Sequence, residues 1–255
     1  NANLDAVERT VRQAASEGGE LVLVPECFAF LGPEQGKLEL AETLGGDGPI
    51  WERCAGLARS VGCDVVFGGF WERGSTKTHV FNTCVHIGPD GGVRAAYRKV
   101  HLFDVDLEDG TRVMESDTIE PGSELVVTDT AFGKLGLSIC YDLRFPELYR
   151  ALVDQGAIAL AVPAAFTLTT GKDHWHVLLR ARAIESQCYV IAAGQWGKHP
   201  GPNRATYGKS LIVDPWGEVI AQCSEGEGLC CATVQGATLE RIRGSLPCLQ
   251  HRKLR

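Results

Sequence analysis

One stretch constrains the fold more than any other, a short apolar strand that leads into a helix with a cysteine at the joint. Residues 135–139 alternate apolar side chains with small ones, and Phe145-Pro146-Glu147 opens a helical pattern that continues through residue 153. Cys140 lies between the two, where the first N–H groups of a helix favour a thiolate over a thiol. Cys140 is therefore either a reactive group or a small buried side chain at the sheet edge.

The rest of the chain alternates helices with strands in the same way. Apolar periodicity predicts helices at 4–15, 51–60, 175–185 and 237–245, strands at 21–24, 64–70, 157–162 and 188–193, and hairpins at 79–99 and 210–221. Residues 33–50 are predicted to form a surface loop, and residues 102–122 a long excursion from the surface to a site. This pattern predicts an α/β fold with mixed sheets covered by helices.

Composition narrows the choice of partners. The net charge is -7, the pI is about 5.5 and the only basic run is at 251–255, which argues against nucleic acid or an anionic membrane surface. No stretch approaches the roughly 18 apolar residues of a membrane span. The ten cysteines include no Cys-x-x-Cys pair, so we expect reduced thiols. The seven histidines do not have the spacing of metal ligands either, so we expect no metal and no other cofactor. Small molecules or proteins remain as partners.

Three chemically useful side chains each stand at the end of a predicted strand. Glu26 follows the strand at 21–24, Lys99 ends the hairpin at 79–99, and Cys140 ends the strand at 135–139. Taken separately, Glu26 and Lys99 are compatible with solvated surface roles, and Cys140 with a small buried side chain. Together, a carboxylate can take the thiol proton, the thiolate can attack an amide or nitrile carbon, and an ammonium can stabilise the oxyanion. No Gly-x-Ser-x-Gly elbow or Ser–His pair competes, so the set predicts acyl transfer.

These segments resemble the signatures of a known family. Residues 24–26 (Val-Pro-Glu), 97–102 (Tyr-Arg-Lys-Val-His-Leu) and 139–147 (Ile-Cys-Tyr-Asp-Leu-Arg-Phe-Pro-Glu) look like the three signature segments of the nitrilase superfamily of carbon-nitrogen hydrolases. Residues 171–175 with 179–185, and 207–210 with 214–217, resemble its Nit subfamily. The resemblance covers nearly the whole chain and implies a four-layer α-β-β-α sandwich, usually a homodimer.

The same resemblance implies roles for individual residues. Cys140 becomes the nucleophile, Glu26 the general base, Lys99 the oxyanion partner with the Tyr141 backbone N–H, and Glu115 a second glutamate beside the lysine. The implied activity is that of a thiol amidohydrolase, which cleaves the amide of a small α-keto acid such as deaminated glutathione through a Cys thioester and releases the amine. An omega-amidase acting on α-ketoglutaramate and a catalytically weak interaction protein are the alternatives.

Further residues are candidates for holding the substrate. The pocket is expected to be lined by Phe28, Phe166, Thr170, His174 and Trp175, although aromatic residues at such positions are more often core. Carboxylates of the substrate need fixed cations, for which the candidates are Arg144, Lys172 and Arg182, unless these are solvated or paired with acids.

Two features depart from the family pattern. Its members begin with an apolar strand ahead of the 4–15 helix, so the chain is expected to be a single domain, 1–255, truncated at its N-terminus and weakened there. A cytoplasmic location is expected, with a mitochondrial one for a longer form. His176 stands where relatives are expected to carry an acid, which affects substrate selection.

Overall fold

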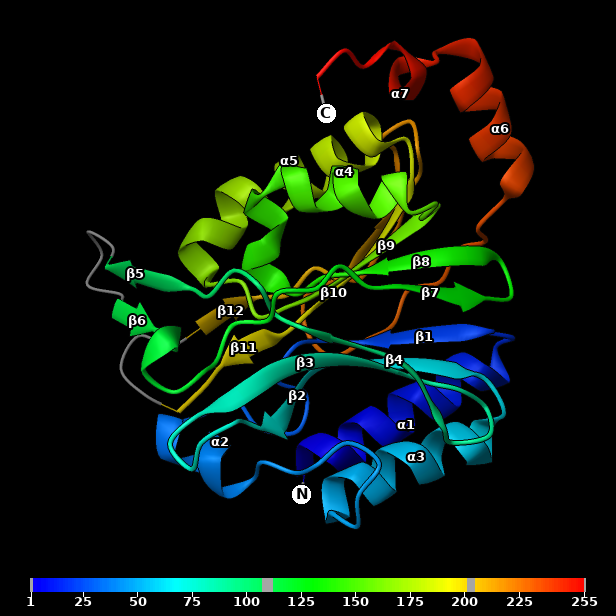
Figure 1. The fold of residues 1–255 in the computed structure, drawn as a ribbon. Coiled ribbons are helices and arrows are strands. Elements are labelled where there is room, and N and C mark those ends of the chain that lie inside the picture. The colour runs from blue at the N-terminus through cyan, green and yellow to red at the C-terminus, as the bar shows by residue number, and fades with distance from the viewer. Residues whose placement is uncertain (1, 107–111, 201–204, 255) are drawn as a thin grey trace.

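The computed structural model describes residues 2–106, 112–200 and 205–254. Two mixed sheets lie face to face between layers of helices, which confirms the α/β class and the predicted α-β-β-α sandwich (Figure 1). The first sheet has the order β1-β2-β3-β4, with β1 (Leu21–Val24), β2 (Asp64–Arg73), β3 (Val80–Ile87) and β4 (Val93–Arg98). The second has the order β14-β13-β10-β9-β8-β7, with β7 (Val127–Thr130), β8 (Gly133–Leu137), β9 (Ala159–Ala164), β10 (Tyr189–Gly194), β13 (Leu211–Val213) and β14 (Val219–Gln222).

Helices cover the outer face of each sheet. The first sheet is covered by α1 (Ala2–Ser16) and α3 (Pro49–Val61), and the second by α4 (Pro146–Asp154) and α5 (Leu168–Ser186) (Figure 1). The chain ends in α6 (Gly236–Ser245) and α7 (Cys248–His251). None of the helices that the structure describes is long and apolar enough to cross a bilayer.

Strand β2 shows why the chain forms two layers of sheet. Val65 and Phe67 pack with the residues of α1 and α3, whereas Val66 between them belongs to the core that the two sheets share. Successive side chains of a strand point to opposite faces, so a strand covered on both sides needs apolar residues at every position. The uninterrupted apolar run in β2 therefore places it in the middle of the sandwich.

The loops contain more structure than the sequence predicts. The predicted loop at 33–50 contains the short helix α2 (Glu34–Glu39), and the segment at 102–122 contains the hairpin of β5 (Asp104–Asp106) and β6 (Arg112–Met114) followed by the 3-10 turn η1 (Glu115–Asp117). Residues 107–111 of that segment lie outside the described residues. These elements are too short to show apolar periodicity, so sequence patterns miss them. A second small hairpin joins β11 (Trp196–Lys198) to β12 (Ala205–Tyr207).

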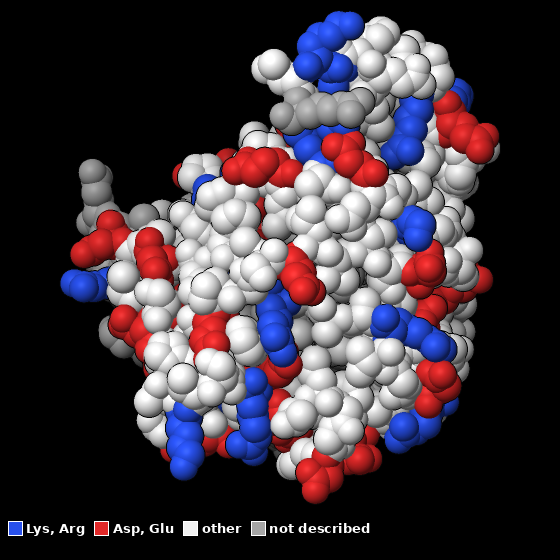
Figure 2. All heavy atoms as spheres, in the orientation of Figure 1, with Lys and Arg blue, Asp and Glu red and all other residues white. Residues whose placement is uncertain are grey.

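The surface charge is mixed. On the face shown in Figure 2, acidic and basic side chains are interspersed, and neither sign covers a continuous area of that face. This distribution agrees with the modest net negative charge of the sequence. The single-domain extent of the chain and a strand ahead of α1 stay predictions.

Candidate active site

Glu26, Lys99 and Cys140 meet between the two sheets. Glu26 follows β1 and Lys99 follows β4 in the first sheet, whereas Cys140 follows β8 in the second and begins the 3-10 turn η2 (Cys140–Arg144). The Lys99 ammonium lies 3.3 Å from Glu26 Oε1. The charges of both residues act on the pKa of the Cys140 thiol, so the three groups share one electrostatic environment. The site therefore exists only when the two sheets are packed together.

Glu26 is held by donors on both of its oxygens. Its carboxylate is buried, with Oε1 accepting from Asn82 Nδ2 at 2.8 Å and Oε2 accepting from the Ala165 N–H at 2.8 Å. Asn82 lies in β3 opposite Lys99, whose N–H donates to the Asn82 carbonyl at 2.9 Å. The sequence analysis misses Asn82, although the register of the hairpin between β3 and β4 would have placed it beside the lysine.

A bulge in β2 makes room for this carboxylate. The register of β2 against β3 shifts between Phe67 and Phe70, and Gly69 within the bulge has a φ of +69°. A Cβ at Gly69 would lie 2.4 Å from the Cys27 nitrogen and 2.9 Å from Glu26 Cγ, so only glycine permits this approach. The bulge thus lets the end of β1 carry Glu26 toward the second sheet.

Lys99 is fully buried between two carboxylates. Its Nζ donates to Glu115 Oε2 at 2.8 Å and Oε1 at 3.0 Å, and Glu115 Oε2 also accepts from the Phe103 N–H at 2.8 Å. Burial alone would lower the pKa of Lys99, but the charges of Glu115 and Glu26 outweigh it and raise this pKa well above its usual value. Lys99 is therefore an ammonium, and Glu115 lies beside it in the described structure.

Cys140 is a neutral thiol at rest. Burial and the negative charge of Glu26 raise the pKa of Cys140 well above its usual value, and the opposing effects of Lys99 and the Ala165 N–H are smaller. The expectation that a helix start favours the thiolate is wrong here, because burial and the charge of Glu26 favour the neutral thiol more strongly. The proton must therefore leave the thiol during attack, and the nearby carboxylate of Glu26 can accept it.

The backbone around the thiol is unusual. Cys140 has a φ of +49°, in the left-handed region that residues with a side chain seldom adopt. The Asp142 N–H donates to the Ile139 carbonyl at 3.1 Å as the first bond of η2. The N–H groups of Cys140 and Tyr141 precede this bond, so the turn itself supplies no acceptor for them.

Arg144 places a positive charge beside the thiol turn. Its guanidinium carbon lies 5.8 Å from the centre of the Tyr141 ring and 5.4 Å from that of Phe166. Nη1 is 3.2 Å from His174 Nδ1. Among the residues that the structure describes, no carboxylate pairs with this arginine, so its charge is available to a bound anion.

Three of the predicted substrate-binding residues are buried and packed against other parts of the fold. Phe28 belongs to the core beneath α1 and α3, with its ring 5.2 Å from that of Phe67. Trp175 is fully buried and donates from Nε1 to the Lys209 carbonyl at 2.9 Å. Arg182 is buried as well and donates to the Leu143 carbonyl at 3.0 Å and to Glu185 at 2.8 Å, which leaves it occupied in supporting η2.

The remaining predicted residues lie around α5. Phe166 packs against Trp175 at 5.0 Å and meets Arg144, whereas the Thr170 hydroxyl is bonded to Thr167 at the start of α5. Lys172 and His174 are exposed on the first turns of the same helix. His176 Nε2 lies 2.9 Å from Gln222 Oε1 and thereby links α5 to β14.

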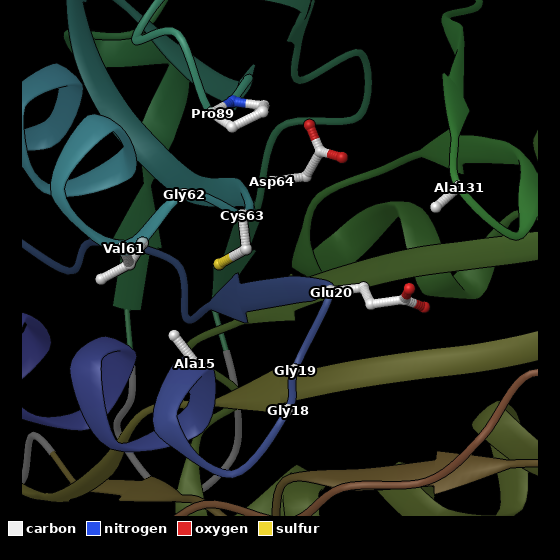
Figure 3. Close-up of a pocket in the computed structure, with 10 residues that line it drawn as sticks. All are labelled: Ala15, Gly18, Gly19, Glu20, Val61, Gly62, Cys63, Asp64, Pro89 and Ala131. Carbon is white, nitrogen blue, oxygen red and sulfur yellow. The ribbon is translucent and has the colours of Figure 1, made fainter.

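Two hollows of the described surface lie away from these residues. A cavity of about 400 Å³ is formed near the starts of β1 and β2 and the turns after β3 and β7, where Glu20 and Asp64 supply carboxylates (Figure 3). Glu26, Lys99 and Cys140 stand at the opposite, carboxyl ends of their strands. Of the three, none lines this cavity or a second one of about 240 Å³ beside Arg73 and His79.

Comparison with known proteins identifies the family. The profile of the family described as Carbon-nitrogen hydrolase matches residues 1–244. The chain is 45% identical over 256 aligned positions to deaminated glutathione amidase of Homo sapiens, covering 98% of this chain and 77% of that protein. It is 46% identical over 253 positions to deaminated glutathione amidase of Synechocystis sp. (strain PCC 6803 / GT-S), covering 98% and 92%.

A solved structure gives the same result. The crystal structure of the C. elegans NitFhit protein has a TM-score of 0.92 and 42% identity, covers 99% of this chain, and is matched over 61% of its own length. The fold, the profile and the high identity over nearly the full length agree with one another. The chain is a member of the carbon-nitrogen hydrolase family.

Proposed function

We propose that the protein is a thiol amidase that hydrolyses deaminated glutathione. The observation that carries this proposal is the buried cluster of Glu26, Lys99 and Cys140. The guanidinium of Arg144, with which no carboxylate of the described residues pairs, lies beside this cluster. The relatives reported above that are named deaminated glutathione amidase support the same substrate. The substrate is an α-keto acid joined by an amide to a Cys-Gly dipeptide, so it carries a carboxylate at each end.

In the proposed reaction, Glu26 moves protons for a covalent intermediate on Cys140. As Glu26 accepts the thiol proton, the sulfur attacks the amide carbon, and the oxyanion is stabilised by Lys99 and the Tyr141 N–H. The C–N bond then breaks, and Glu26 gives the proton to the leaving amine. Water, deprotonated by Glu26, attacks the thioester, and Cys140 recovers its proton as the keto acid leaves.

Glu115 has a supporting role in this scheme. Its two hydrogen bonds hold the Lys99 ammonium in place and keep it charged. The cluster of two carboxylates and one ammonium therefore has one unbalanced negative charge, which lets Glu26 act as a base while Lys99 remains an electrostatic partner of the oxyanion.

Arg144 is the proposed anchor for the carboxylate of the keto acid. An arginine presents a planar fork that matches a carboxylate, and Tyr141 and Phe166 limit where this fork can lie. The exposed Lys172 and His174, nearby on α5, are proposed to meet the more distant end of the substrate. The loss of one charged hydrogen-bonded pair costs about 1.5–3 kcal/mol, or roughly ten- to a hundred-fold in kcat/KM.

Comparing three compounds tests the substrate. We expect kcat/KM to be highest for deaminated glutathione, lower for α-ketoglutaramate and lowest for a nitrile, which has no amine to protonate. Arg144→Gln should lower kcat/KM for deaminated glutathione by about ten- to a hundred-fold. The matched control is Arg94→Gln, which removes an exposed arginine paired with Asp90 in the hairpin. A preference for α-ketoglutaramate would assign omega-amidase activity instead, and turnover of the nitrile alone would refute the amidase.

We also propose that two copies of the chain associate through an exposed apolar surface. Val177 and Ile184 on α5, and Trp216 in the turn before β14, are 65%, 47% and 55% exposed. The turn packs on the helix, because a Cβ at Gly217 would lie 2.5 Å from Ile184. Apolar surface of this kind favours self-association. Light scattering should give a dimer that Trp216→Asp dissociates and Trp196→Asp, at another exposed tryptophan, does not; a monomeric parent protein would contradict this proposal.

We further propose a reducing compartment, the cytoplasm, with mitochondria as the location of a longer form. All ten cysteines, each of which the structure describes, are free thiols. Cell fractionation with immunodetection tests this, and enrichment in a secreted fraction would contradict it.

A further inference from the structure

We propose that Asp142 is a positioning residue that fixes the Cys140 turn against the strand end that carries Lys99. This proposal rests on the function proposed above. Asp142 is fully buried in η2. Its carboxylate forms hydrogen bonds with residues from both sheets, and it acts on the reacting groups through these residues. The backbone N–H of Ile139, next to Cys140, is one of the donors that it holds.

The carboxylate of Asp142 accepts four hydrogen bonds. Oδ2 accepts from the Tyr97 hydroxyl at 2.7 Å and from the Ile139 N–H at 2.8 Å. Oδ1 accepts from the His101 N–H at 3.1 Å and faces His101 Nδ1 at 2.7 Å. A buried carboxylate that accepts several donors has all of its lone pairs used, so each donor fixes its position.

The donors come from the two chain segments that bear the reacting groups. Tyr97 lies in β4 of the first sheet and His101 follows it, so these two residues stand on either side of Lys99. Ile139 immediately precedes Cys140 in the second sheet's segment. A shift of Asp142 would therefore change the position of the thiol relative to the ammonium, and a misplacement of about 1 Å can lower a rate about a hundred-fold.

Only an anion suits this position. A carboxylate oxygen offers His101 Nδ1 only an acceptor, so at 2.7 Å this nitrogen carries the proton of the pair, and the ring is fixed by stacking on Phe145 at 3.7 Å. Burial and the charge of Asp142 raise the pKa of Tyr97, so the phenol stays a donor. An asparagine has the same shape, but its NH2 group would point at one pair of these donors.

The test compares two tyrosines with equivalent burial. Tyr97→Phe removes a donor to Asp142, whereas Tyr149→Phe removes a fully buried hydroxyl that is bonded to Ser138 at 2.9 Å and not to Asp142. We expect Tyr97→Phe to lower kcat about tenfold with KM changed less than about threefold, and Tyr149→Phe to keep both parameters within about threefold. Asp142→Asn should lower kcat about a hundred-fold or more.

Two readouts separate positioning from loss of the fold. Adding Tyr97→Phe to Asp142→Asn should lower kcat little further, since both changes disrupt one unit. Amide hydrogen exchange should accelerate only in peptides covering 97–102 and 139–144. Equal kcat losses in the two tyrosine variants, additive losses in the double variant, or acceleration spread over the whole chain would overturn the proposal. If the parent protein hydrolyses no amide, the proposed function fails. The role of Asp142 is then decided by hydrogen exchange alone, that is, by whether exchange accelerates only in 97–102 and 139–144 or over the whole chain.

Discussion

Replacing Glu115 with glutamine should slow turnover while it makes the thiol more reactive. The carboxylate makes two bonds to Lys99 Nζ, at 2.8 and 3.0 Å, and one oxygen also accepts from the Phe103 N–H. A glutamine oxygen can replace the oxygen with two donors, but its NH2 group then faces the ammonium. One charge-assisted hydrogen bond is lost, which corresponds to about 1.5–3 kcal/mol.

That loss has two expected consequences of opposite sign. If it appears in the transition state, kcat/KM for the amide falls about ten- to a hundred-fold, because Lys99 is no longer held for the oxyanion. The pKa of Cys140 is raised by burial, by Glu26 and also by Glu115, so removing the charge of Glu115 lowers this pKa. Iodoacetamide should therefore label Cys140 faster at neutral pH in the variant.

The assay pairs steady-state hydrolysis with mass spectrometry of the labelled Cys140 peptide. Glu120→Gln is the matched control, because Glu120 accepts from the Ser75 N–H and hydroxyl in the same part of the chain and does not contact Lys99. The control should retain both rates within about threefold. Unchanged turnover in Glu115→Gln, or slower labelling of Cys140 than in the parent protein, would refute the assigned arrangement of charges.

Three further predictions concern Cys140, Glu26 and His86. Cys140→Ala should abolish hydrolysis and the acyl-enzyme mass while circular dichroism stays unchanged; residual turnover above about 0.1% would contradict a covalent mechanism. Glu26→Gln should retain the bonds from Asn82 and Lys99 to one oxygen but slow both acylation and deacylation in rapid-quench kinetics, and loss of only one step would argue against a shared base. His86 is buried between the sheets, with Nε2 3.0 Å from Asp64 and Nδ1 3.0 Å from Thr128, and burial lowers its pKa despite Asp64 while Arg94 acts in the same direction as burial. Below about pH 6.5 unfolded His86 binds a proton more readily than folded His86, so the free energy of unfolding should fall as the pH drops from there. In urea titrations this fall should be smaller in His86→Gln; equal slopes would contradict the prediction.

Much of the site is predictable from the sequence because strand ends are easy to locate. Glu26, Lys99 and Cys140 each follow an apolar run, and the carboxyl ends of such strands lie where chemistry is collected. Asn82 is within reach of the same reasoning, because the hairpin register sets it opposite Lys99. Local patterns are enough for these positions.

Other features depend on contacts that local patterns do not contain. Trp175 and Arg182 are residue types that are common in binding pockets. In the structure, however, their side chains donate hydrogen bonds to the carbonyls of Lys209 and Leu143, which lie far from them in sequence. The raised pKa of Cys140 depends on which groups the second sheet brings to the first. The 3-10 turn η2 between β8 and α4 has no apolar period of its own, so the sequence does not show that this turn lies between the thiol and the start of α4.

The left-handed backbone at Cys140 has a consequence for engineering this protein. A residue with a side chain at a φ of +49° is less stable than glycine there by roughly 1–2 kcal/mol. Cys27, next to Glu26, has a φ of +57° and carries a similar penalty. A screen that selects only for heat resistance would thus reward glycine at position 140 and enrich inactive clones. Any search for a hardier form of this protein has to select for turnover at the same time.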